Sequence, residues 1–225
     1  MTTRTPRRRN QILAAAARLI AAQGPSANTS VREIADEAGV LSGSLYYHFK
    51  AGKDEIIEAI ISMHLEDLLA RYARVTSRDS SPVEMLEGLI RASFDALAAQ
   101  PDASQIYQNE YRHMSGSPTF AAVRDATHRI QTVWMGVIYK GVDEGVFRRD
   151  VEPIVFYRFA RDAIWPSVRW YLHDSSPELA TIANSCVRLF LDGLVVGRTE
   201  AEIPPAKAGL PTSESSPVSR TSLAG

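Results

Sequence analysis

Cysteine is nearly missing from this chain of 225 residues, which carries Cys186 alone. One thiol excludes an intrachain disulfide and the repeated cysteine spacing of a structural zinc site. Cys186 lies in an apolar helical stretch, where a small core residue is expected. The sequence therefore predicts a protein of the reducing cytoplasm, associated with the nucleoid if it binds DNA, and without a metal site.

Long apolar runs are missing as well. No stretch of about 18 apolar residues occurs, so we expect no transmembrane helix. The basic N-terminus leads into an Ala-rich amphipathic segment that ends at Gln23 and Gly24, which is not the pattern of a signal peptide.

Signatures of catalysis are missing too. The sequence has no nucleophile elbow, no metal-ligand spacing and no glycine-rich phosphate loop, so we expect neither enzymatic activity nor a cofactor. A helical enzyme would have to rely on His64, His113 and His128. His64 faces the apolar stripe of a predicted helix, and we interpret it as a core histidine with satisfied hydrogen bonds rather than as a ligand contact.

Charge is distributed unevenly, although the formal net charge is only -1. Residues 1–53 hold eight Lys or Arg and three acidic residues, whereas the remainder holds 17 basic and 23 acidic residues. A basic head on an acidic body indicates a polyanion bound at one end only. A basic disordered tail is the alternative, but it does not explain the pattern that follows the first arginines.

The segment 29–53 carries that pattern and reads TSVREIADEAGVLSGSLYYHFKAGK. Ser30 and Glu33 are placed to form a capping box at the start of a helix, and Gly39 is placed to end it. A second, short helix is expected over 42–48. A helix, a tight turn and a short helix make a helix-turn-helix, whose second helix enters the major groove of DNA with its N-terminal end.

The outward face of the short helix supplies the candidate DNA contacts. Leu45 and Phe49 are four residues apart and face inward, while the small residues at the start of the helix allow the backbone to approach DNA. Tyr47 and His48 can donate to phosphate oxygens, and Lys53 opens the next helix beside further backbone donors. The candidate DNA-binding residues are Thr29, Ser30, Ser42, Gly43, Ser44, Tyr46, Tyr47, His48 and Lys53.

The stretch REIADEAGVLSGSLYYHFKAGKDEI resembles the DNA-binding domain of the TetR family of bacterial repressors. That family shares an LYYHF-type recognition helix followed by a K-[DE]-E-[LI] helix start. The resemblance implies a ligand-responsive repressor that binds a palindromic operator as a homodimer and is released by a small effector. Gly52 departs from the family pattern, which more often has Ser or Asn there, and we expect Asp54 to compensate in part for the missing cap.

The hydrophobic periodicity predicts an all-α fold of about nine helices. We expect an N-terminal three-helix helix-turn-helix DNA-binding domain over 1–53, with a flexible basic arm over 1–7. A C-terminal helical ligand-binding and dimerisation domain follows over 54–198, and a disordered tail over 199–225. Besides the helix-turn-helix pair, the expected helices span 8–23, 54–75, 82–100, 103–114, 119–144, 154–172 and 179–196. The last two helices, paired with their symmetry mates, would form a four-helix dimer interface.

The predicted helix over 154–172, IVFYRFARDAIWPSVRWYL, is the most informative part of the body. Arg161, Trp165 and Arg169 follow one another at spacings of four, so they share a helix face. Pro166 is expected to bend this helix. Arginine binds phosphate through two parallel hydrogen bonds, and tryptophan offers a flat face to a ring system.

Together with IYQNEYRHM and LSGSLYYHF, this helix is similar to the TetR-family repressors of steroid (cholesterol) ring catabolism in actinobacteria. The similarity implies an effector that is a CoA thioester of a steroid-degradation intermediate, with Trp165 and Arg169 taking part in the response. The residues alone leave open another hydrophobic effector, such as a fatty acyl-CoA or a drug, and a helical interaction module without DNA. They also leave open that the arginines pair with carboxylates such as Asp162 at the dimer interface. The candidate ligand-binding residues are Arg161, Trp165, Arg169, Tyr107, Glu110, Met114 and Trp134.

Overall fold

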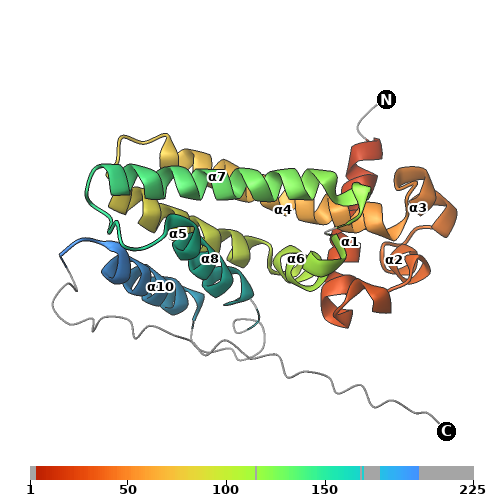
Figure 1. Ribbon diagram of the computed structural model, residues 1–225. Coiled ribbons are helices and arrows are strands. Elements are labelled where there is room, and N and C mark those ends of the chain that lie inside the picture. Colours follow the sequence, from red (N-terminus) through yellow and green to blue (C-terminus); the bar gives the residue numbers. More distant parts are fainter. Residues whose placement is uncertain (1–3, 115, 168, 170–177, 198–225) are drawn as a thin grey trace, which may run out of the picture.

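The computed structural model describes residues 4–114, 116–167, 169 and 178–197. In these residues it has nine α-helices, three short 3₁₀ helices and a single isolated bridge between Phe147 and Val195 in place of any sheet, which confirms the expected all-α fold. The expected tail over 199–225 lies outside the described residues. Three helices and a 3₁₀ turn gather at one end of the molecule and form the head (Figure 1): α1 (Arg4–Gln23), η1 (Ser26–Asn28), α2 (Val31–Glu37) and α3 (Ser42–His48).

The remaining elements form the body. In chain order they are α4 (Lys53–Thr76), α5 (Pro82–Ala99), α6 (Pro101–Met114), η2 (Pro118–Phe120), α7 (Ala121–Asp143), α8 (Pro153–Ile164), η3 (Trp165–Ser167) and α10 (Leu179–Leu194). Helix α4 starts beside the head and continues along the body against α7 and α5 (Figure 1). Helix α6 packs against α1 and η1 of the head and against α4, so it joins the body to the head beside the start of α4.

Local sequence signals explain the head. The Ser30 hydroxyl accepts the Glu33 backbone N–H at 3.2 Å, and a Glu33 carboxyl oxygen accepts the Ser30 N–H at 2.7 Å, so the expected capping box is present. Gly39 adopts a φ of 62° where α2 ends. Leu45 and Phe49 are fully buried, which confirms the inward face expected for α3.

The basic N-terminal segment differs from the expected arm, because α1 already begins at Arg4. The guanidinium of Arg8 donates to the Gln11 side chain at 3.0 Å and to the Gly39 carbonyl oxygen at 3.1 Å. The guanidinium of Arg9 lies over the Phe49 ring at 4.9 Å from its centroid. These contacts bind Arg8 and Arg9, at the start of the helix expected over 8–23, to the head.

The start of α4 explains the glycine at position 52. Gly52 has a φ of 68° and a ψ of -132°, a conformation that side chains with a Cβ adopt only under strain. No side chain caps the helix at Gly52. Instead, a Glu55 carboxyl oxygen accepts the Ala51 N–H at 2.9 Å, so Glu55 takes the compensating role expected of Asp54.

The helix expected over 154–172 is shorter than the periodicity predicts. Helix α8 ends at Ile164, and Trp165–Ser167 form a 3₁₀ turn instead of a bent continuation. Pro166 explains this end, since its ring excludes the regular α-helical hydrogen bond at that point. Trp165 is therefore held on a tight turn, and residues 170–172 lie outside the described part of the chain.

Candidate DNA-binding surface and effector cavity

Helix α3 presents a polar, largely open surface to solvent. Tyr47 is 77% exposed, and Tyr46, Ser42 and Gly43 are also exposed, while Ser44 and His48 are half-buried. The Tyr47 and His48 rings meet edge to face at 5.3 Å between centroids. Six of the nine candidate DNA-binding residues thus lie on one short helix at the tip of the head (Figure 1).

Leu41 belongs to the same surface, although the sequence pattern did not single it out. It is the N-cap residue of α3 and is 83% exposed. An apolar side chain at the start of a recognition helix can contact the methyl group of thymine. The sequence signal for Leu41 was an apolar residue in the turn, outside the buried faces of the two neighbouring helices.

Two other candidates of the DNA surface have a structural role. Thr29 is buried, and its hydroxyl donates to the Gln23 side chain at 2.6 Å, so it does not reach the surface. The Lys53 ammonium donates to the carbonyl oxygens of Ser26 and Thr29 at 2.6 and 2.9 Å. Lys53 therefore holds the η1 turn, where carbonyl groups converge, instead of pointing outward to a phosphate. Ser30 remains exposed, with its hydroxyl engaged in the capping box.

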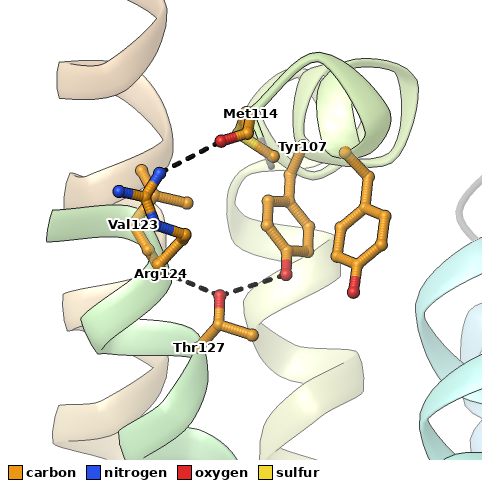
Figure 2. Close-up of a pocket in the computed structure, with 6 residues that line it drawn as sticks. Tyr107, Met114, Val123, Arg124 and Thr127 are labelled. Atoms are coloured by element: carbon orange, nitrogen blue, oxygen red, sulfur yellow. Dashed lines mark hydrogen bonds between the residues drawn. The ribbon is translucent and has the colours of Figure 1, made fainter. Parts of the chain in front are cut away.

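The body contains a cavity of about 190 Å³ between α6 and α7 (Figure 2). Its walls are mostly apolar and aromatic, and its lining residues are Tyr107, Tyr111, Met114, Val123, Arg124 and Thr127. The Thr127 hydroxyl donates to the Val123 carbonyl oxygen at 2.8 Å, so it accepts from the Tyr107 hydroxyl at 3.2 Å. Burial raises the pKa of Tyr107 to about 12, which keeps that donor protonated.

Arg124 supplies a positive charge to this cavity. The same guanidinium nitrogen, Nη1, donates to the Met114 carbonyl oxygen at 3.1 Å (Figure 2) and to the Ser117 carbonyl oxygen at 2.7 Å, which fixes the side chain across the end of α6. The residue itself is exposed. Sequence reasoning missed Arg124, because an arginine on the outer face of a long helix does not stand out among other surface charges.

A second cavity of about 70 Å³ lies on the other side of Tyr107. Its lining residues are Tyr107, Gln108, Tyr111, Arg161, Asp162, Trp165 and Pro166. The Trp165 ring is buried against Tyr107, with 5.2 Å between ring centroids. Arg161 donates through Nε to Asp162 at 2.7 Å, and its guanidinium lies 6.0 Å from the Tyr157 ring centroid. The ion pair considered for Arg161 is therefore formed within the chain, at the wall of a cavity.

The structure brings four of the seven candidate ligand residues to these two cavities, namely Tyr107, Met114, Arg161 and Trp165. Trp134 is instead part of the core, where its ring packs between those of Tyr72 and Tyr157 at 6.3 and 6.0 Å. Arg169 is exposed and lies beyond the 3₁₀ turn, so it does not continue the helical face of Arg161.

Glu110 points away from the cavities and toward the head. It is 5% exposed, and its carboxyl oxygen accepts the backbone N–H of Ser26 at 2.7 Å. The carbonyl oxygen of the same Ser26 accepts from Lys53. A side chain of α6 is thus joined through the η1 turn to the first residue of α4, and the role expected of Glu110 as a ligand residue is replaced by a link between body and head.

Comparison with known proteins assigns the chain to a family. Residues 12–60 match the bacterial regulatory proteins of the tetR family, and residues 79–194 match the tetracyclin repressor-like C-terminal domain. The chain is 41% identical to the HTH-type transcriptional repressor KstR2 of Mycobacterium tuberculosis (strain ATCC 25618 / H37Rv) over 187 residues, which span 83% of this chain and 92% of that repressor. The chain belongs to the TetR family.

Several solved structures share the architecture. The ketosteroid transcriptional regulator KstR2 of Mycobacterium tuberculosis superimposes with a TM-score of 0.76 at 36% identity, over 84% of this chain and 95% of that one. AibR, solved with isovaleryl coenzyme A and operator DNA, has a TM-score of 0.73 at 23% identity, over 82% and 98% of the two chains. FadR from Bacillus subtilis, solved with stearoyl-CoA, has a TM-score of 0.69 at 23% identity, over 81% and 97%.

Membership of the TetR family decides the class of function. Members of this family are regulators that bind operator DNA as dimers and respond to small molecules, and this chain is a TetR-type transcriptional repressor rather than an enzyme. Relatives at 37% and 41% identity are the HTH-type transcriptional repressors KstR2 of Rhodococcus jostii and Mycobacterium tuberculosis. Among the described helices, none has the length and apolar character needed to cross a membrane.

Proposed function

We propose that the effector of this TetR-type repressor is a CoA thioester whose acyl group is a fragment of a steroid ring system. One observation carries the proposal: two cavities with aromatic walls meet at Tyr107, and each has an arginine, Arg124 or Arg161, in its wall. Aromatic and apolar side chains suit an alicyclic acyl group. Guanidinium groups suit the phosphates of CoA.

The comparisons support the same effector class. KstR2 is described as a ketosteroid regulator, and the fold neighbours AibR and FadR were solved with isovaleryl coenzyme A and stearoyl-CoA. Trp165 offers its face to a ring at the edge of the second cavity. Arg169, one turn further on, is proposed to contact the phosphates of CoA rather than the acyl group.

The test is a thermal-shift comparison on the full chain. Decahydronaphthalene-2-carboxyl-CoA, its free acid, CoA itself and stearoyl-CoA would be added at equal concentrations. A ligand at a hundred times its Kd stabilises by about 2.7 kcal/mol, which raises Tm by roughly 5–10 °C in a protein of this size. We expect that shift for the fused-ring thioester and little for its acid. An equal shift with the free acid would refute the CoA class, and a larger shift with stearoyl-CoA would favour a fatty acyl-CoA effector.

For the DNA side, we propose that α3 enters the major groove of a palindromic operator. The exposed Ser42 and Gly43 and the half-buried Ser44 allow close approach, Leu41 contacts a base edge, and Tyr47 and His48 donate to phosphates. Phosphate neutralisation by the basic head makes affinity fall steeply as salt rises. Measuring operator affinity at increasing salt concentrations tests this contact scheme. An affinity that does not change with salt would refute it.

Dimerisation is proposed to use α8 and α10. Phe159 on α8 is 68% exposed and Leu189 on α10 is 74% exposed, and Val155 adds a further exposed apolar side chain. Two such helices and their symmetry mates form a four-helix interface that buries this apolar surface. Phe159→Glu should yield a monomer in analytical ultracentrifugation, whereas an unchanged dimer would place the interface elsewhere.

The release mechanism that we propose is a shift between two arrangements of the heads. Residues 1–53 act as the DNA-binding unit and residues 54–198 as the unit that binds effector and dimerises, in a cytoplasmic protein. Helix α6 lines both cavities and holds the head through Glu110, so a ligand that moves α6 acts directly on the η1 turn. An effector that binds better when the heads are too far apart for the operator then lowers DNA affinity.

A further inference from the structure

A buried histidine on α4 has one ring nitrogen committed and one without a partner. His64 is 5% exposed, and its Nε2 lies 3.1 Å from the Ser104 hydroxyl oxygen. That hydroxyl donates to the Gln100 carbonyl oxygen at 3.0 Å, so its hydrogen is not available to the ring. Nε2 must therefore carry the proton and donate to Ser104, which leaves Nδ1 as an acceptor. Nδ1 is buried and has no hydrogen-bond partner among the described residues.

His64 also lines a third, very small cavity of about 10 Å³ next to the effector site. Its lining residues are His64, Leu68, Ser93, Ala96, Leu97, Ser104, Tyr107, Gln108 and Trp165. Three of them, Tyr107, Gln108 and Trp165, also line the 70 Å³ cavity, so the two spaces share a wall. A space of this size accepts one hydroxyl group and not a ring.

The Ser93 hydroxyl on this wall is already paired. The Ser93 hydroxyl donates to the Leu89 carbonyl oxygen at 2.8 Å and accepts from the Tyr72 hydroxyl at 2.6 Å. Burial lowers the pKa of His64 to about 4, so the ring is uncharged near pH 7. Because His64 Nδ1 is an uncharged acceptor in apolar surroundings, it cannot pair with a carboxylate or with another hydrogen-bond acceptor of a ligand. It matches a hydrogen-bond donor on the ligand.

We propose that His64 selects effectors whose ring system carries a hydroxyl group, with the ring in the 70 Å³ cavity and the hydroxyl donating to Nδ1. The inference rests on the proposed function, because it places the acyl group of the effector in that cavity. It adds the chemical identity of the ring substituent. A ketone at the same position sets one acceptor against another and leaves Nδ1 unpaired, which lowers affinity by about tenfold to a hundredfold.

Isothermal titration at pH 7.5 on the full chain tests the proposal with two matched pairs of probes. The first pair is 6-hydroxy- and 6-oxo-decahydronaphthalene-2-carboxyl-CoA, and the second is the free decahydronaphthalen-2-ol and decahydronaphthalen-2-one. We expect the alcohol to bind at least tenfold more tightly than the ketone in whichever pair binds. Equal Kd values for alcohol and ketone, or no binding of either free compound and either thioester, would overturn the role of His64.

Variants separate the hydrogen bond from the shape of the site. His64→Phe removes Nδ1 and should bring the alcohol-to-ketone ratio to about one, whereas His64→Asn keeps an acceptor and should retain part of the preference. Ser104→Ala frees the His64 ring to carry its proton on either nitrogen, so it should narrow the difference in Kd between alcohol and ketone while His64 itself stays in the cavity wall. A preference that survives both His64→Phe and Ser104→Ala contradicts the proposal. His128→Gln, at an exposed histidine of α7, is the control.

The two proposals fail differently in this experiment. If the free alcohol binds through His64 but the thioesters do not, the CoA class is wrong and the hydroxyl selection stands. If both thioesters bind with equal Kd, the CoA class stands and the hydroxyl selection is wrong.

Discussion

Glu110→Ala should destabilise the protein and weaken communication between effector and operator. In the structure Glu110 is buried, and it accepts the Ser26 backbone N–H at 2.7 Å across the junction of α6 and the head. Ser26 is itself buried, so its N–H has no access to solvent once the carboxyl group is removed. The substitution therefore removes one side of a hydrogen bond and leaves the other unsatisfied.

The size of the effect follows from two contributions. An unsatisfied buried backbone donor costs about 1–3 kcal/mol. The lost packing of the deleted side chain adds about 1 kcal/mol. We expect a decrease of about 2–4 kcal/mol in the free energy of unfolding for Glu110→Ala. Glu110→Gln keeps an amide oxygen at the same place and should lose less than half as much.

Urea unfolding measures the stability, and fluorescence anisotropy of a labelled operator measures the coupling. Effectors in allosteric proteins typically change affinity by about 5–150-fold. We expect that factor, measured with decahydronaphthalene-2-carboxyl-CoA, to fall toward one in Glu110→Ala and to persist in Glu110→Gln. Glu66→Ala is the control, because Glu66 forms an exposed pair with Arg129 at 2.6 Å, and such pairs contribute at most about 1 kcal/mol.

Two results would contradict this role of Glu110. If Glu110→Ala and Glu66→Ala unfold at the same urea concentration, the buried hydrogen bond does not contribute as described. If Glu110→Ala loses stability but keeps the full effect of effector on operator affinity, the link stabilises the fold without transmitting the signal.

Three further substitutions and conditions have defined outcomes. Gly141→Ala on α7 should lower the free energy of unfolding in urea by about 1–3 kcal/mol, because a Cβ there would clash with the ring of the buried Phe147. Gly136→Ala on the same helix is the matched control: its Cβ meets nothing within 4 Å, so it should raise the free energy of unfolding by up to about 1 kcal/mol. Tyr47→Ala should weaken binding to all DNA sequences by a similar factor and leave Tm unchanged, because the side chain is 77% exposed; a loss confined to one operator sequence would show base contact instead. Lowering the pH should destabilise the wild type more than His64→Phe. Burial chiefly lowers the pKa of His64, from 6.5 to about 4, so the unfolded state binds the proton at a higher pH than the folded state. The free energy of unfolding therefore decreases by roughly 3 kcal/mol as pH falls from above 6.5 to 4. Parallel pH profiles of the two proteins would contradict this.

The parts of the head that the sequence predicts are those set by short-range chemistry. The capping box at Ser30, the helix end at Gly39 and the bounds of α3 depend on residues within a few positions of one another. Lys53 shows the limit of such reasoning. Its position at a helix start predicts a phosphate contact, but the carbonyl groups that bind it come from a turn 24 to 27 residues earlier. No local pattern encodes that approach.

The candidate effector site shows the same limit in three dimensions. The candidates Tyr107 and Met114 both line the 190 Å³ cavity, since they lie on one face of α6, and Tyr111 between them shares that face. Whether this face meets α7 or the head depends on how α6 is rotated against its neighbours. The rotation turns Glu110, three positions after Tyr107, toward Ser26, which is 84 residues away in the chain. Because neighbouring positions on α6 contact the cavity and the head, we expect a ligand that displaces Tyr107 to move the same helical turn that carries Glu110.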